Sequence, residues 1–224
     1  MLMYTWMVWV EKAPERYDQA VKIMTGGKID TIKKIISLKI KPGEKVLDIG
    51  CGTGSLALQC VERGATVTGV DSSMFMLNEC NKKIKELNLE GQFNVVLDSV
   101  TQLEKNFKKE SFDFIVSTMV VGEFPKDYMD YIFNSCKELL KPGGKIMIAD
   151  EVWPKSFIYR QLFKIIMGIL WIPQFLILRR AFYPIKDLEE IIIRAGFKII
   201  SVKNWPGSTF QLVEAEKVIE SVII

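Results

Sequence analysis

The chain has 224 residues, of which 49% are hydrophobic and 25% charged, a composition that is typical of a globular protein and excludes disorder. Its 30 basic and 27 acidic residues give a net charge of +3, which is too balanced to indicate nucleic-acid binding. The absence of histidine excludes Ser-His-Asp and Cys-His catalysis and a His-liganded metal.

The four cysteines lie far apart, at positions 51, 60, 80 and 136, and no two form a C-x-x-C pair. We therefore expect neither a zinc ribbon nor a redox disulfide, and no bound metal. Reduced thiols are typical of the cytoplasm, where we expect this protein. The apolar N-terminus lacks the basic region and cleavage site of a secretory signal.

Short apolar and β-branched runs alternate with helical segments along the chain. The predicted strands are 45–50, 66–71, 92–98, 112–119 and 145–150, and the predicted helices are 55–63, 73–87 and 128–140. Pro-Gly steps at 42–43 and 142–143 predict turns before the first and fifth strands. Two more strands, 197–205 and 209–217, are joined closely enough to form an antiparallel hairpin.

This alternation predicts an α/β fold with a doubly wound, seven-stranded, Rossmann-like sheet. We expect one domain over residues 1–224. Its parts would be N-terminal cover helices (1–40), a cofactor-binding core (41–151), an apolar, basic, helical insertion before the sixth strand (152–195) and the C-terminal hairpin (196–224).

The first predicted strand runs directly into a glycine-rich loop, DIGCGTGS, at 48–55. Glycines let the backbone turn sharply and approach a ligand, and ligands of open α/β sheets lie outside the carboxyl ends of the strands. Gly50, Gly52 and Gly54 do not match the dinucleotide fingerprint, and no lysine follows as in a Walker A loop. Asp48 would repel a pyrophosphate but suits an ammonium or hydroxyl group, as in S-adenosylmethionine, which has no phosphate.

Acidic residues end the next two predicted strands as well. Asp71, about 20 residues after the first glycine, is placed to accept hydrogen bonds from ribose hydroxyls. Asp98 is placed to accept one from an adenine amino group, and Met76 to pack on the adenine face. A lone aspartate at a strand end is usually a turn former or a helix cap. Three at successive strand ends, one beside a glycine loop, predict a nucleoside-containing cofactor.

Five segments resemble, in order, the motifs of class I S-adenosylmethionine-dependent methyltransferases: 46–54 (VLDIGCGTG), 69–77 (GVDSSMFML), 96–100 (VLDSV), 111–124 (SFDFIVSTMVVGEF) and 139–151 (LLKPGGKIMIADE). The resemblance implies S-adenosylmethionine as cofactor, S-adenosylhomocysteine as product and the transfer of a methyl group. The candidate cofactor-binding residues on these motifs are Asp48, Gly50, Cys51, Gly52, Gly54, Asp71, Ser72, Met76, Asp98 and Ser99. Tyr17, in the segment before the core, is a further candidate, for the methionine part of the cofactor.

The core is similar to the ubiquinone/menaquinone-type methyltransferases, which act on lipid-soluble rings. Residues 13–28 and 149–152, with the apolar insertion, are similar to a group associated with corrinoid proteins. The first likeness implies a small, rather apolar acceptor. The second implies a corrinoid-related acceptor or a corrinoid protein as a candidate partner.

Glu123, beyond the fourth strand, and Glu151, at the end of the fifth, are the candidate catalytic residues. Methyl transfer is an in-line displacement that needs a base only if the acceptor must lose a proton, and without histidine an acid is a suitable one. The alternative for each residue is a solvated loop acid or a helix cap. Cys51 is better interpreted as a small filler of the loop than as a nucleophile.

Residues 157–178 form an apolar stretch whose charge-free run, 165–178, is shorter than the roughly 20 residues that span a membrane. Between 151 and 186 there are six basic residues and one acid. This pattern suits peripheral binding to an anionic membrane surface, or to an acidic protein partner, through 155–186. The alternatives are a core-packing insertion with a solvated basic rim and, for 157–181, a cover over the substrate site.

We therefore interpret the chain as a methyltransferase that acts on a lipid-soluble ring or a corrinoid-related group. One alternative is a non-catalytic subunit that binds the cofactor or docks on a partner. Another is an NAD(P)-dependent oxidoreductase, against which Asp48 and Ser55 argue. A nucleic-acid substrate is not expected, since no Asn/Asp-Pro-Pro-Tyr sequence follows the fourth strand.

Overall fold

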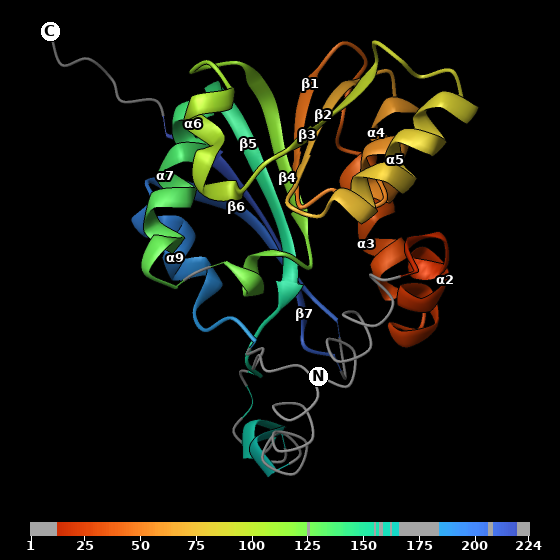
Figure 1. Ribbon diagram of the computed structural model, residues 1–224. Helices are drawn as coiled ribbons and strands as arrows, with labels where there is room; N and C mark the ends of the chain where they lie inside the picture. The colour runs from red at the N-terminus through yellow and green to blue at the C-terminus, as the bar shows by residue number, and fades with distance from the viewer. Residues whose placement is uncertain are drawn as a thin grey trace, which may run out of the picture.

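A computed structural model describes residues 13–124, 126–154, 156, 159–161, 163–165, 184–205 and 208–218. The described chain builds a seven-stranded sheet in the order β3-β2-β1-β4-β5-β7-β6 (Figure 1). Strands β1 to β5 are parallel to one another, whereas β7 is antiparallel to both β5 and β6. The strands are β1 (Lys45–Ile49), β2 (Thr66–Asp71), β3 (Phe93–Leu97), β4 (Phe112–Thr118), β5 (Leu140–Glu151), β6 (Phe197–Asn204) and β7 (Phe210–Lys217).

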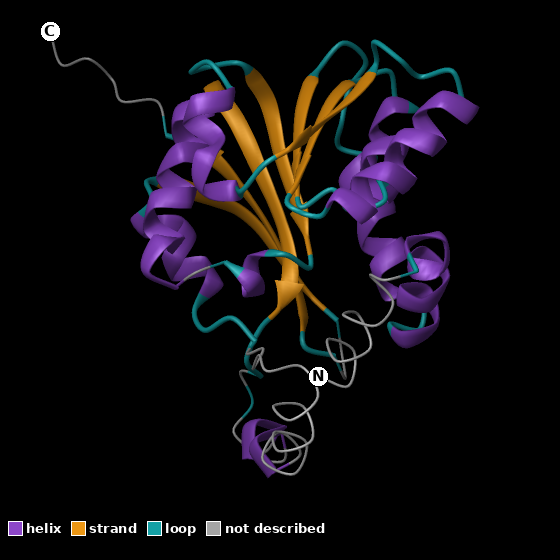
Figure 2. Cartoon of the chain, viewed as in Figure 1, coloured by secondary structure: helices purple, strands orange, loops and turns teal. Residues whose placement is uncertain are grey.

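Helices cover both faces of the sheet (Figure 2). On one side lie α3 (Lys28–Ser37), α4 (Ser55–Val61) and α5 (Met74–Glu86), and on the other lie α6 (Leu103–Asn106), α7 (Met129–Leu139) and α9 (Leu188–Arg194) (Figure 1). The first described helix, α2 (Pro14–Met24), packs against α3 and α5. The short 3-10 helices among the described residues are η1 (Val100–Gln102), η2 (Val121–Glu123) and η3 (Lys126–Tyr128).

The core consists of two apolar clusters, one on each face of the sheet. Successive residues of a central strand alternate between them: Val46 belongs to the cluster under α3 to α5, and Leu47 to the cluster under α7 and α9. A strand buried on both faces is apolar at most positions, which explains why Val46, Leu47 and Ile49 of β1 are all apolar; the buried Asp48 is the exception.

The predicted fold is confirmed: the sheet is doubly wound and ends in an antiparallel hairpin of β6 and β7. The fifth strand is longer than predicted. It begins at Leu140, which pairs with Phe112, and the pairing resumes between Phe114 and Lys145. The Pro142-Gly143 step, predicted as a turn before the strand, is accommodated by this irregularity inside β5, where Gly143 has a φ of +73°.

Of the insertion predicted over 152–195, the structure describes only parts. Helix α9 closes it and leads into β6, and Val152 and Ile185 form an isolated parallel bridge. The stretch 166–183 lies outside the described residues, so its predicted helical character stays a prediction. No described helix has the length and apolar character needed to cross a bilayer.

Candidate active site

A cavity of about 1180 Å³ opens at the carboxyl ends of β1, β2, β3 and β4. It brings together eleven residues that the sequence singled out: Tyr17, Asp48, Gly50, Cys51, Gly52, Asp71, Ser72, Met76, Asp98, Ser99 and Glu123. Gly54 and Glu151 are not among the described residues that line it. One end of the cavity is formed by α2, α3, the glycine loop and the ends of β2 and β3; the other is formed by η2, α7, Trp153 and residues 184–194.

The glycine loop turns back on β2. The Gly50 and Cys51 amides both donate to the carbonyl oxygen of Val70, at 2.7 and 3.1 Å. Gly50 and Gly54 have positive φ angles of +69° and +79°. A Cβ at Gly50 would overlap the Val120 side chain, and a Cβ at Gly54 would lie 2.6 Å from Cys80 Sγ. The loop can therefore pack against Val120 and Cys80 only because positions 50 and 54 are glycines.

Gly52 differs from its two neighbours in the loop. It also has a positive φ, of +52°, but the nearest atom to a Cβ at this position would be Met76 Cε, at 3.8 Å. The space in front of Gly52 belongs to the cavity. Gly52 thus leaves room for a ligand to approach the backbone, whereas Gly50 and Gly54 allow the loop to pack.

Asp71 links the end of β2 to the glycine loop. Its Oδ2 accepts the Gly52 amide and its Oδ1 accepts the Ser73 amide, both at 2.8 Å. Burial raises the pKa of Asp71, and these backbone hydrogen bonds oppose the shift. Because each carboxylate oxygen has two lone pairs, Asp71 can still accept hydrogen bonds from a pair of vicinal hydroxyls.

Asp98 follows β3 at the rim of the cavity. It accepts the Asn106 side-chain amide at 2.8 Å and the Ser99 backbone amide at 2.6 Å, and these two bonds lower its pKa. The Ser99 hydroxyl in turn caps η1 by accepting the Thr101 amide at 3.3 Å. The carboxylate stays ionised and is a hydrogen-bond acceptor at the place where a base edge would lie.

Asp48 is buried under the loop, with 1% of its surface exposed, and its Oδ2 has no hydrogen-bond partner among the described residues. Burial raises its pKa to about 7, against the opposing charge of Lys33. Lys33, on α3, is itself only 9% exposed and lines the cavity. An acidic acceptor and a basic donor therefore lie together at the floor of the site.

Sequence reasoning missed Lys33 because a lysine on an amphipathic helix is usually solvated. One signal was available. Lys33 follows the buried Ile29 by four residues and precedes the buried Ile36 by three, a spacing that places it on the apolar face of α3.

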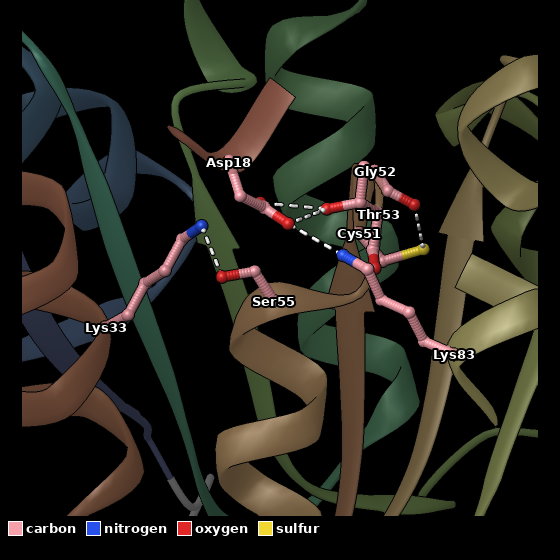
Figure 3. Close-up of polar contacts among 7 residues, drawn as sticks. All are labelled: Asp18, Lys33, Cys51, Gly52, Thr53, Ser55 and Lys83. Atoms are coloured by element: carbon pink, nitrogen blue, oxygen red, sulfur yellow. Dashed lines mark hydrogen bonds and ion pairs between the residues drawn. The ribbon is translucent and has the colours of Figure 1, made fainter. Parts of the chain in front are cut away.

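A polar cluster of Asp18, Thr53 and Lys83 fastens α2 to the glycine loop and to α5 (Figure 3). The Thr53 hydroxyl donates to the Asp18 carboxylate at 2.9 Å, and Lys83 Nζ lies 2.6 Å from Asp18 Oδ2. Lys83 also donates to the Thr53 carbonyl at 3.2 Å. Tyr17 precedes Asp18 on α2, so the cluster that anchors Asp18 also keeps Tyr17 at the cavity wall.

The far end of the cavity is mainly apolar. Its apolar lining residues are Val120, Phe124, Met129, Trp153, Ile185 and Ile191. Glu123, on η2, is exposed and lines this end, as does an ion pair in which Arg194 lies 3.0 Å from Asp130. Among the described residues, no group of cysteine, aspartate and glutamate side chains is arranged to hold a metal ion.

Glu151, the second candidate base, is 8% exposed, and its Oε1 accepts the Thr209 hydroxyl at 3.0 Å. The preceding residue, Asp150, is fully buried and accepts the Gly122 and Glu151 amides at 3.1 and 2.7 Å. The two acids thus join β5 to the η2 segment and to the loop before β7, and the structure does not bring Glu151 to the cavity surface.

These residues fit S-adenosylmethionine. The unpartnered Asp48 Oδ2 suits its α-ammonium group, the open face of Gly52 admits its chain, and the remaining lone pairs of Asp71 suit its ribose hydroxyls. Asp98 and the buried Met76 lie where the adenine would be held.

A protein-family model described as a methyltransferase domain matches residues 46–144. The demethylmenaquinone methyltransferase of Oceanobacillus iheyensis is 28% identical over 197 residues, which cover 80% of this chain and 78% of the relative. The phosphoethanolamine N-methyltransferase of Plasmodium falciparum is 24% identical, covering 86% of this chain and 68% of that protein.

Solved structures show the same fold. Magnesium protoporphyrin IX methyltransferase from Synechocystis PCC 6803, determined with bound SAH, superposes with a TM-score of 0.60 at 20% identity and covers 84% of this chain and 80% of that one. The family match rules out the oxidoreductase alternative. With its glycine loop, its acids at the strand ends and its methyltransferase domain, the chain is a class I S-adenosylmethionine-dependent methyltransferase.

Proposed function

We propose that this methyltransferase acts on a lipid-soluble ring, the hydroquinone form of a demethylmenaquinone-like acceptor. The observation that carries the proposal is the two-part cavity. Its volume of about 1180 Å³ exceeds the roughly 300–1,000 Å³ of a typical single-ligand pocket, so it has room for an acceptor beside the cofactor. The end that the cofactor residues leave open is lined by apolar side chains beside Glu123, Lys186 and the Asp130–Arg194 ion pair, and its apolar part favours a ring as acceptor.

The relatives support the same class of acceptor. Demethylmenaquinone methyltransferases from three Bacillus species, each 26–28% identical and each covered over 87–90% of its length, accompany the Oceanobacillus relative. Two other relatives are phosphoethanolamine N-methyltransferases, whose acceptor is small and charged. The apolar residues Phe124, Met129 and Ile191 favour the first class.

In the proposed reaction the cofactor supplies an electrophilic methyl group on its sulfonium. Transfer of that methyl to a ring carbon of the hydroquinone would leave S-adenosylhomocysteine and release one proton from the ring. Glu123, exposed at the cavity wall, is placed to accept it. The remaining work of the chain is to hold both molecules in line and to exclude water, through the apolar lining.

The acceptor would reach the site from a membrane. Of the basic residues in 155–186, the structure describes Arg160, Lys164 and Lys186, and all three are exposed. Beside them, Tyr159 and Ile165 are each 62% exposed. Mixed basic and apolar side chains of this kind favour an anionic bilayer surface. The bases Lys155, Arg179 and Arg180 lie outside the described residues.

The test is a methyl-transfer assay with labelled S-adenosylmethionine and a short-chain demethylmenaquinol kept reduced, with phosphoethanolamine in a parallel reaction. We expect label in the quinol alone. Transfer to phosphoethanolamine alone would overturn the acceptor class. Cofactor binding with no transfer to either acceptor would favour the non-catalytic alternative, and sedimentation with phosphatidylglycerol vesicles tests the membrane contact separately.

The corrinoid partner is a further expectation, which rests on residues 13–28 and 149–152. It stays a prediction. Addition of cobalamin to the same assay, with loss of quinol methylation or label in the corrinoid as readout, distinguishes a corrinoid acceptor from a quinol.

A further inference from the structure

The ammonium group of Lys33 is held at the floor of the cavity without a charged partner in contact. Among the described residues, its hydrogen bond goes to a neutral group, the Ser55 hydroxyl, at 3.1 Å (Figure 3). Burial lowers the pKa of Lys33, and the charges of Asp18, Asp48 and Asp30 oppose that shift. Burying an ammonium group without a charged partner in contact costs free energy of folding.

The acids around Lys33 are not equivalent. Asp18 already accepts from Thr53 and from Lys83, which lies 2.6 Å away. Asp48 has an oxygen without a donor among the described residues. The floor of the cavity therefore presents one cationic donor and one anionic acceptor, and neither has the partners that burial normally requires.

Beyond the acceptor proposed above, we infer that Lys33 binds the α-carboxylate of the cofactor's amino-acid end, while Asp48 accepts from its α-ammonium group. The inference rests on S-adenosylmethionine being the cofactor. Its zwitterionic end complements this pair of charges in both sign and number. A ligand that lacks the carboxylate would leave Lys33 buried and unpaired, so Lys33 makes the site selective for cofactors that carry a free carboxylate.

The matched control is Lys83. It also lies at the glycine loop, on α5, but its ammonium is engaged by Asp18 and by the Thr53 carbonyl. Replacement of Lys83 loosens α2, which covers the whole cofactor end, whereas replacement of Lys33 removes one contact to one group. The two variants therefore differ in which ligands they affect.

The experiment compares S-adenosylmethionine with decarboxylated S-adenosylmethionine, which differs only by loss of the carboxylate, by calorimetry at pH 8. In Lys33→Met we expect the affinity for S-adenosylmethionine to fall roughly 10- to 100-fold, the range for a lost hydrogen bond to a charged group. The affinity for the decarboxylated ligand should change less than about twofold, within the uncertainty of additivity. Lys83→Met should weaken both ligands by similar factors.

If Lys33→Met loses the same affinity for both ligands, Lys33 has a structural role and the inference is wrong. The inference is also wrong if the affinity for neither ligand falls. Lys33→Gln, which keeps a donor for Ser55, repeats the test if the methionine variant unfolds at a lower temperature than the wild type. Lys33→Arg should retain the preference for the carboxylate. If the wild-type protein binds neither ligand, S-adenosylmethionine is not the cofactor and the inference fails with it. That result differs from one in which the wild type binds both ligands but the variants show no selectivity.

Discussion

The carboxylate of Asp18 lies 2.6 Å from the ammonium nitrogen of Lys83, although 65 residues separate them in the chain. Thr53 joins the same cluster through its hydroxyl and its carbonyl. Helix α2, the glycine loop and α5 therefore meet at one point above the cofactor end of the cavity. This contact holds α2 over the glycine loop, so that the helix covers the cofactor end of the cavity.

Breaking this contact should shorten the residence time of the cofactor. In Lys83→Met we expect the dissociation rate of S-adenosylhomocysteine to rise by a few-fold and the free energy of unfolding to change by less than about 1 kcal/mol, because the pair is partly exposed. Stopped-flow displacement measures the rate. Lys82→Met, at the exposed neighbouring position, is the control. An unchanged dissociation rate would mean that α2 does not limit release.

Asp48 should make both stability and binding depend on pH. Its pKa is raised by burial from 3.8 to about 7, so the native state holds the proton more tightly than the unfolded state. The stability that this proton provides is fully present below about pH 4 and is lost as the pH rises to about 7. Ionised Asp48 is also the form that accepts from an ammonium group, so cofactor affinity should rise over the same upper range.

Asp48→Asn tests this directly. The unfolding free energy of the variant minus that of the wild type should increase between pH 4 and 7. Cofactor binding should be weaker in the variant, and its affinity should not rise near pH 7. The other titratable groups coupled to Asp48 are Lys33, Asp71, Cys51 and Cys60. Chemical unfolding and calorimetry at matched pH values give both curves. Parallel wild-type and variant curves would show that another of these groups titrates.

The three loop glycines should respond differently to alanine. The positive φ alone costs about 1–2 kcal/mol at each position. At Gly50 and Gly54 the added Cβ also overlaps the side chains of Val120 and Cys80, so their free energies of unfolding should fall further, by roughly 1–3 kcal/mol. Gly52→Ala should be the mildest for stability but should weaken cofactor binding, because its Cβ enters the cavity. Urea unfolding and calorimetry measure the two effects, and an equal loss of stability in all three variants would contradict this division of roles.

Glu123→Gln should lower the rate of methyl transfer and leave cofactor binding intact. Loss of a general base typically costs roughly 10²- to 10⁴-fold in rate. The expected signature is a fall in kcat with little change in the S-adenosylmethionine affinity. Glu62→Gln, exposed at the end of α4, is the matched control. A wild-type rate in Glu123→Gln would remove this residue from the mechanism.

The glycine loop and the acids at the strand ends could be predicted because their signals are local. Each element of the motif follows a strand within a few residues, and parallel strands bring their carboxyl ends to one edge. The Asp18 cluster and Lys33 could not be predicted in this way, because their contacts depend on how α2 and α3 pack against helices that occur later in the chain.

Glu151 illustrates a different limit. Asp150 and Glu151 follow each other at the end of β5, and residues in succession on a strand point to opposite faces. The sequence indicates two acids near the site but not which one faces it. In the structure neither carboxylate is at the cavity surface: Asp150 accepts the Gly122 amide, and Glu151 accepts the Thr209 hydroxyl.

The helices at the two ends of the cavity pack into different apolar clusters. Helices α2 and α3, beside the glycine loop, pack into the cluster on one face of the sheet, whereas Phe124, Met129, Ile185 and Ile191 belong to or pack on the other. Substitutions at these four positions therefore leave the packing of α2 and α3 in place, whereas Val120, which packs against Gly50, joins the two ends. An architecture divided in this way allows new acceptors to be acquired during evolution while the methyl donor stays the same.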